Sequence, residues 1–183
     1  MAPEFTIRRA RSSDADEISR LISIFAAEAL MLKRTPGMVE LAIDDYVVAT
    51  DARGHIVGCG ALKEYSPSVA EVAAIAVSRD VHGCGVGRAI VSAVEKLASK
   101  RGIYDLFALT LQPEFFSAIG YQRVDRARYP EKIRRDCLGC ARVGSRATRF
   151  ASPRICASRP GRPRKRCSRR RFKACGAQSE RKD

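Results

Sequence analysis

Three glycines at alternate positions are the clearest chemical feature of this sequence, in the segment His82-Gly83-Cys84-Gly85-Val86-Gly87-Arg88. Backbone N–H groups that glycine leaves uncovered can converge on phosphate oxygens, and the positive end of a following helix strengthens the attraction. The spacing differs from the Gly-x-Gly-x-x-Gly of dinucleotide-binding folds and lacks the Gly-Lys-Ser or Gly-Lys-Thr of a Walker loop. The segment therefore predicts a phosphate site that serves neither a nicotinamide cofactor nor nucleotide hydrolysis. A simple tight turn is the alternative.

Cysteine is the second residue type that could do chemistry, and the chain has seven. Cys137 and Cys140 have the spacing of zinc ligands, but one such pair supplies half of a tetrahedral site. We therefore predict no metal. Cys59 and Cys84 are expected to be small packed or loop residues.

A strand must lead into this glycine loop (residues 82–88), and a helix must follow it. The run 69–77 is small and β-branched enough to be a central strand. After the loop, apolar residues recur at helical spacing from Val86 to Leu97, and Gly102 provides a stop. The sequence thus predicts a strand, a phosphate-binding loop and a helix in succession.

The remaining segments alternate between strand and helix patterns. Ser13, with Asp16 three residues later, predicts the cap of a first helix, and Pro36-Gly37 breaks the helical pattern after it. We expect further strands at 5–8, 46–49, 55–62 and 106–111, and short helices at 38–43 and 113–119. This alternation in a chain of 183 residues predicts one α/β domain.

The net charge of +14 is concentrated at one end of the chain. Residues 142–183 hold 15 of the 34 Lys and Arg and 2 of the 20 acidic residues, so residues 1–141 are nearly neutral. We expect the folded domain to be 1–141 and 142–183 to be a basic tail, either disordered or read out of frame. The beginning of the chain has no signal peptide pattern and no run long enough to cross a bilayer, so a cytoplasmic protein without membrane contact is expected.

The glycine loop resembles that of the GNAT acetyltransferases, whose signature is Gln or Arg, two residues, Gly, one residue, then Gly or Ala. Gly85 and Gly87 match it, while His82 stands in the first position. The resemblance implies a GNAT fold, an α/β (α+β) domain with a central mixed, mostly antiparallel sheet flanked by helices. It also implies acetyl-CoA as co-substrate, bound by three places: Ile75-Ala76-Val77, the glycine loop, and Phe115 with Phe116.

Three further segments resemble the short, acetyltransferase-only N-acetylglutamate synthases. These are Leu109 to Tyr121, Tyr129 to Ile133 and Asp136 to Cys140. The likeness covers roughly residues 5–140, and past Cys140 we find neither the further cysteine nor the closing strand of such relatives. It implies acetyl transfer to the α-amino group of L-glutamate or L-glutamine, the first step of arginine biosynthesis.

The resemblance also assigns roles in proton transfer. Glu71 stands where GNAT enzymes often carry a carboxylate that acts through water as general base, although a solvated acid at a strand end fits equally well. Phe116 occupies the place of the tyrosine that protonates the leaving thiolate in many relatives, and phenylalanine cannot donate a proton. Tyr121 and Tyr129 are the substitutes, although a core or surface position is the commoner fate of a tyrosine.

A dicarboxylate acceptor needs cationic partners, and the resemblance points to Lys33, Arg34 and Lys63. Gln112 is expected to bind acceptor or cofactor, or to cap the helix that it begins. An acetyltransferase for proteins or aminoglycosides would keep the same fold and cofactor. A nucleic-acid-binding regulator that uses the basic tail is a weaker reading, because the tail offers few aromatic residues for stacking. A homodimer is left open.

Overall fold

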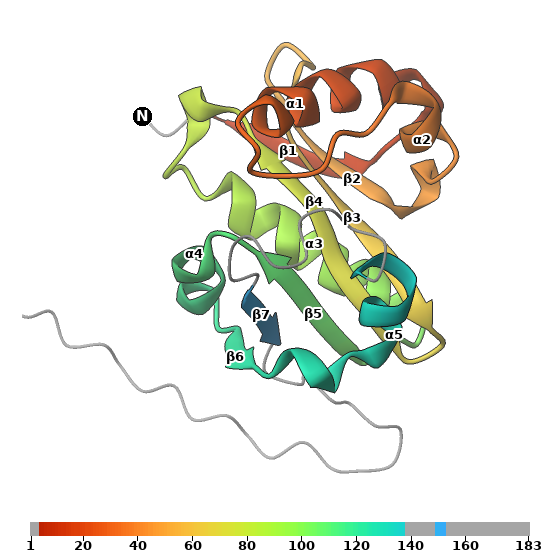
Figure 1. Cartoon of the computed structure of the whole chain (residues 1–183). Helices are drawn as coiled ribbons and strands as arrows, with labels where there is room; N and C mark the ends of the chain where they lie inside the picture. Colours follow the sequence, from red (N-terminus) through yellow and green to blue (C-terminus); the bar gives the residue numbers. More distant parts are fainter. Residues whose placement is uncertain (1–3, 138–148, 153–183) are drawn as a thin grey trace, which may run out of the picture.

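The computed structural model describes residues 4–137 and 149–152 of the 183-residue chain. Strands and helices alternate from β4 Val69–Val77 onward, after two consecutive helices and three consecutive strands (Figure 1). The strands are β1 Phe5–Arg9, β2 Tyr46–Asp51, β3 Ile56–Ser66, β4 Val69–Val77, β5 Asp105–Thr110, β6 Gln122–Val124 and β7 Arg149–Ser152. The helices are α1 Ala15–Ala27, α2 Pro36–Glu40, α3 Val86–Lys100, α4 Pro113–Ala118 and α5 Pro130–Lys132, the last followed by the π-helical turn η5 Ile133–Cys137.

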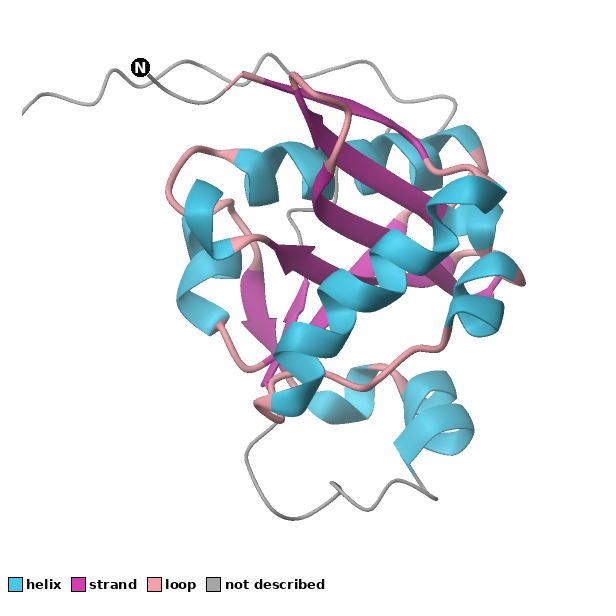
Figure 2. Ribbon diagram, turned by 90° about the horizontal axis from the view of Figure 1, so that it is seen from above, coloured by secondary structure: helices cyan, strands magenta, loops and turns pink. Residues whose placement is uncertain are grey.

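The strands of the described part form one sheet in the order β1-β2-β3-β4-β5-β7-β6. Every neighbouring pair is antiparallel except β4 with β5, which is parallel. Helices lie on both faces of the sheet (Figure 2). This mixed, mostly antiparallel sheet flanked by helices confirms the fold class that the sequence predicts.

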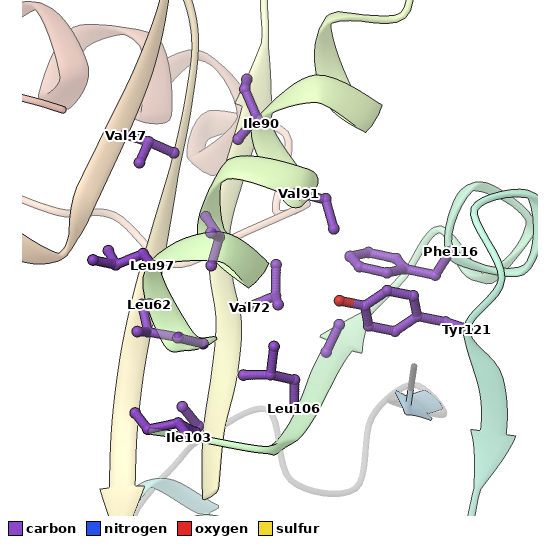
Figure 3. Close-up of a cluster of buried hydrophobic side chains, with 14 of the residues drawn as sticks. Val47, Leu62, Val72, Ile90, Val91, Leu97, Ile103, Leu106, Phe116 and Tyr121 are labelled. Carbon is purple, nitrogen blue, oxygen red and sulfur yellow. The ribbon is translucent and has the colours of Figure 1, made fainter. Parts of the chain in front are cut away.

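One face of the sheet is an apolar core under α3. Ile90, Val94 and Leu97 of this helix are buried against aliphatic side chains of the strands, among them Leu62 and Val72 (Figure 3). The helix approaches so closely that a Cβ added at Gly60 would lie 2.5 Å from Ile90 Cγ2. Glycine is therefore required in β3 at this crossing.

The opposite face packs against α1 and α2. Ile18 and Ile22 of α1 and Val39 of α2 are fully buried there, beside residues of β2 to β4 that alternate with those of the α3 core. Tyr46, at the start of β2, belongs to this second core. The two cores divide the side chains of each central strand between them.

Strands β4 and β5 pair over a short stretch and then part. Their ladder runs from the pair Val69–Asp105 to the pair Glu71–Phe107, after which β5 continues beside β7. A bulge interrupts β4 a few residues further on, where Ala74 has a φ of +53° and the register with β3 shifts. The later part of β4 thus keeps main-chain groups on the β5 side that the sheet does not use.

Several local expectations need correction. Pro36 does not end a helical pattern but opens α2, where it takes a first-turn position and the Thr35 hydroxyl accepts a hydrogen bond from the N–H of Met38 at 3.3 Å. The N-cap of α1 is Asp14 rather than Ser13, and its side chain makes no capping bond to α1. The Asp14 carboxylate instead accepts from the N–H of Arg11 at 2.7 Å, in the 3-10 turn that precedes the helix.

The expectation that no strand closes the sheet is also wrong. Strand β7 lies beyond residue 141 and pairs with both β5 and β6, so it fills the place between them (Figure 1). The residues of β7 lack the strong alternation of apolar and polar side chains that would predict a strand. The other residues assigned to the basic tail, and Cys140, lie outside the described part of the chain.

Candidate active site

The glycine loop adopts a conformation that only glycine reaches without strain. Gly83 and Gly85 have φ values of +79° and +83°, and a Cβ added at either would meet nothing within 4 Å. Gly85 is the N-cap of α3, and the first intrahelical bond runs from Ala89 N–H to its carbonyl at 3.0 Å. The N–H groups of residues 86–88 therefore have no acceptor within the helix and face the open space at its N-terminus.

The loop is held at both ends. The His82 ring donates from Nε2 to the carbonyl of Val77 at 2.8 Å, which ties the loop to the end of β4. On the other side, the Phe115 ring packs against Gly87, with ring atoms 3.1 and 3.2 Å from where a Cβ would stand. Arg88 Nη2 donates to the carbonyl of Ala118 at 3.4 Å, so α4 is also fixed beside the loop.

The end of β4 contributes the other predicted cofactor contacts. Ala76 is buried in the core under α1, whereas Ile75 and Val77 are half-buried and pack beside α3. Cys84 is half-buried in the loop. Phe116 lies within the α3 core, edge-on to the Tyr121 ring (Figure 3). Phe116 is thus a core residue, while Phe115 is the one that borders the loop.

A group of five charged and polar side chains, two of them buried and three half-buried, lies on the face opposite α3, at the point where β4 and β5 part. We call it the Lys132 cluster, because Lys132 Nζ contacts three of its members. It donates to Glu71 Oε2 at 2.8 Å, to Asp136 Oδ2 at 2.8 Å and to the Tyr65 hydroxyl at 3.0 Å. The fifth member, Lys63, donates to Asp136 Oδ2 at 2.6 Å.

Tyr65 connects the two acids of this cluster. Its hydroxyl lies 2.8 Å from Glu71 Oε2 and also forms a close hydrogen bond with Asp136. Burial, reinforced by the charge of Glu71, raises the pKa of Tyr65 well above its usual value, so the phenol keeps its proton. Tyr65 therefore has one proton to donate to either carboxylate, and its oxygen accepts from Lys132.

The ion pairs determine the protonation state of the cluster. Burial alone would lower the pKa of Lys132, but the negative charges of Glu71 and Asp136 outweigh it and the pKa is raised. Burial alone would raise the pKa of Asp136, but hydrogen bonds from Lys132 and Lys63 outweigh it and the pKa is lowered. Lys132 and Asp136 are therefore each stabilised in the charged form.

Two predicted site residues, Glu71 and Lys63, are members of the Lys132 cluster. They are cross-strand partners of β4 and β3, so their side chains share one face of the sheet. Glu71 is 5% exposed and paired with Lys132, and is therefore not a solvated acid at a strand end. Its role as base remains a prediction.

The two predicted tyrosines lie on different faces. Tyr121 is in the α3 core and its hydroxyl donates to Glu95 of α3 at 3.0 Å. Tyr129 is on the face of Glu71, where its ring stacks on Phe107 at 4.1 Å between centroids and its hydroxyl donates to Asp105 at 3.1 Å. Of the two, Tyr129 is therefore the nearer to the Lys132 cluster in the fold.

The other predicted acceptor residues are separated from one another. Lys33 is exposed and Arg34 is half-buried in the segment between α1 and α2, where the Ser19 hydroxyl donates to the Arg34 carbonyl at 2.7 Å. Gln112 is exposed at the N-cap of α4 and makes no side-chain capping bond. The structure thus does not place Gln112 in the capping role.

Sequence reasoning missed Tyr65, Lys132 and Asp136. Two weak signals were present, since Lys63 and Tyr65 alternate along a strand and Lys132 and Asp136 have the spacing of one helical turn. Neither signal says that the two pairs meet. Among the described residues, no group of three or more His, Cys, Asp or Glu could hold a metal ion. No helix there is long and apolar enough to cross a membrane.

Residues 19–123 match the model of the acetyltransferase (GNAT) family, and the chain belongs to this family. An uncharacterized N-acetyltransferase of Chlorobaculum tepidum is 37% identical to it over 139 residues, which are 76% of this chain and 89% of the relative. The amino-acid acetyltransferase of Mycobacterium tuberculosis is 33% identical over 65% of this chain and 69% of its own length. That of Pasteurella multocida is 33% identical, and the match spans 30% of its length.

Solved structures of related proteins have a similar fold. The N-acetylglutamate synthase of Neisseria gonorrhoeae, complexed with coenzyme A and N-acetyl-glutamate, superposes with a TM-score of 0.74 at 28% identity, over 83% of this chain and 35% of that one. The M. tuberculosis protein Rv2747, in complex with CoA and NLQ, gives 0.67 at 26% identity, over 80% and 96%. The fold, the open glycine loop and these CoA complexes identify acetyl-CoA as the co-substrate.

Proposed function

We propose that this chain transfers the acetyl group of acetyl-CoA to the α-amino group of L-glutamate or L-glutamine. The observation that carries the proposal is the Lys132 cluster, a polar site at the point where the β4–β5 ladder ends. Two members of the cluster, Lys132 and Glu71, are buried, and charge that is costly to bury is typical of a site that binds a charged ligand such as an amino acid. The names of the M. tuberculosis and P. multocida relatives support the same class of acceptor.

The residues present fit acetyl-CoA, which supplies the activated acetyl group. The N–H groups of residues 86–88, with the positive end of α3, suit the pyrophosphate. The main chain of β4 beyond the ladder, including Ile75 and Val77, suits the amides of the pantetheine arm. Phe115 forms a side wall of the loop.

The acceptor must lose a proton before its nitrogen attacks. We propose that Glu71 takes this proton through a water molecule, while Lys132 and Tyr65 hold the carboxylate in position. As the new N–C bond forms, the C–S bond breaks and the thiolate leaves as CoA. Tyr129 is the better placed of the two tyrosine candidates for returning a proton, because it shares the face of Glu71.

Arg34 and Lys63 are the proposed partners of the acceptor carboxylates. Lys63 already pairs with Asp136, so an acceptor that binds there competes with, or displaces, that carboxylate. Arg34 makes no ion pair with any residue of the described part of the chain. We therefore assign the firmer contact to Arg34. Lys33 remains a weaker candidate because it is exposed.

Acetylation of glutamate begins arginine biosynthesis, and we propose that step for this chain. The test is release of free CoA thiol with each of the twenty amino acids, spermidine, an aminoglycoside and a lysine peptide as acceptors. We expect turnover with glutamate, glutamine or both. If both are inert while the peptide or the aminoglycoside reacts, the proposed acceptor is wrong, although family and cofactor stand.

A further inference from the structure

Three tyrosines of the described chain are almost fully buried, and one of them differs from the others. Tyr121 and Tyr129 are 4% and 1% exposed, and each hydroxyl donates to a carboxylate. Tyr46 is 1% exposed, yet its hydroxyl has no hydrogen-bond partner among the described residues. A buried hydroxyl without a partner destabilises the folded state, and phenylalanine would pack at least as well. The unpartnered Tyr46 hydroxyl therefore indicates a group that binds a ligand.

Tyr46 lies on the face of the proposed acceptor site. It pairs across β2 and β3 with Ala61, which pairs in turn with Ala73 of β4. The next row on this face, two residues along β3, is Lys63 with Glu71. Tyr46 thus shares its row with two alanines, Ala61 and Ala73, and lies one row from Lys63 and Glu71 of the Lys132 cluster.

Arg34 supplies positive charge at the same place. Burial raises the pKa of Tyr46 to about 12 and that of Cys59 to about 12, and in both cases the Arg34 charge opposes the rise. The Arg34 backbone lies on the same side of the sheet as both groups, because its carbonyl accepts from Ser19 of α1, the helix that packs on the core containing Tyr46 and Cys59. Cys59 in turn donates from Sγ to the carbonyl of Ala74 at 3.6 Å, which places this group of residues at the bulge of β4.

A hydroxyl donor and a guanidinium, neither with an acceptor among the described residues, are complementary to a carboxylate. We propose that the Tyr46 hydroxyl and Arg34 together bind the α-carboxylate of the amino-acid acceptor, with Tyr46 donating a hydrogen bond to it. We assign the α-carboxylate rather than the side-chain carboxylate to this pair, because the α-carboxylate is bonded to the same carbon as the attacking amine. That amine must reach the bulged part of β4. This inference rests on the function proposed above.

Tyr46→Phe tests the proposal because it removes one oxygen atom. We expect the KM for glutamate and for glutamine to rise about tenfold or more, since a hydrogen bond to a charged group is lost. The kcat and the KM for acetyl-CoA should change less than twofold. An unchanged KM for both acceptors, or a rise for glutamate alone, would overturn the assignment to the α-carboxylate.

A second measurement separates ligand binding from a structural role. In the absence of ligands, Tyr46→Phe should unfold at the same temperature as the parent chain or higher. Tyr121→Phe and Tyr129→Phe should unfold at lower temperatures, because each removes a hydrogen bond to a carboxylate, although Asp105 keeps its ion pair with Arg128. A loss of stability in Tyr46→Phe equal to that in Tyr129→Phe would show that its hydroxyl has a partner in the free chain, against the proposal.

Arg34→Ala and the double variant complete the test. If both groups hold one carboxylate, the double variant should raise the acceptor KM by less than the product of the two single effects. Multiplicative effects would contradict a shared ligand. A parent chain inert towards glutamate and glutamine would instead refute the proposed function, and the pair could then still be tested with any amino acid that reacts and with its α-amide.

Discussion

The two faces of β4 differ in what their buried side chains do. Ala70 and Val72 pack under α3 among aliphatic residues, and the buried tyrosine of that core, Tyr121, donates to the half-buried Glu95 of α3. Glu71, between them in sequence, lies on the other face with two lysines and an aspartate. Near Glu71, one face of β4 is therefore apolar core and the other carries charge that is costly to bury, while further along the strand Ala76 belongs to the second core under α1. Variants on each face should separate stability from activity.

Glu71→Gln should break this comparison most sharply. The amide keeps the shape and the contact with Tyr65 but cannot accept a proton, so we expect the rate to fall by about 10² to 10⁴-fold. Some stability should also be lost, because the buried Lys132 then keeps only Asp136 as a carboxylate partner. The measurement is the pH profile of kcat, which should lose its acid limb in the variant. An unaltered profile would make Glu71 a structural residue.

Ile90→Ala addresses the opposite face. Ile90 is fully buried over Gly58 and Gly60, so its truncation leaves a cavity and should cost about 2–5 kcal/mol of unfolding free energy. Denaturant unfolding measures the loss, and the KM values of the remaining folded enzyme should be unchanged. Ile24→Ala, at a site 54% exposed, is the control and should stay within about 0.5 kcal/mol. A shifted acceptor KM in Ile90→Ala would undo the division between faces.

Gly85→Glu tests whether the glycine loop that follows β4 binds the phosphates of CoA. A carboxylate there repels phosphate, so CoA should no longer protect the chain, whereas the parent gains about 2.7 kcal/mol at a hundredfold excess over Kd. Thermal unfolding with and without CoA is the measurement. Gly54→Glu is a matched control, since Gly54 has a φ of +87° and equally open surroundings in the turn between β2 and β3. Protection lost in both variants would point to backbone strain.

Asp136→Asn should give the smallest effect. The folded pKa of Asp136 is lowered, so the unfolded chain binds the proton more readily and the stabilisation is present above the unfolded pKa of about 3.9 and lost as pH falls. We expect the variant to melt about 2–4 °C below the parent at neutral pH, roughly 1 kcal/mol. The difference in melting temperature between variant and parent should become smaller from about pH 5 to about pH 2. A constant gap would mean that the pairing with the lysines is not its cause.

The sequence alone determined those parts of the protein whose conformation depends on residues close together in the chain. The glycine loop, the strand before it and the helix after it follow from residues within about thirty positions, because turn chemistry and hydrophobic periodicity are local. The same locality misled at Pro36, since a proline that interrupts one helix is also suited to the first turn of the next.

Tertiary structure decided which distant side chains meet. Lys132 reaches Glu71 across 61 positions and Tyr65 across 67, a distance along the chain at which no spacing rule operates. Strand β7 has its place because β5 and β6 leave a gap in the sheet, not because its own residues form a pattern. Whether a buried tyrosine has a partner, as Tyr129 does and Tyr46 does not, depends on strand register and on what packs opposite. These are relations between elements, so they exist only once the chain has folded.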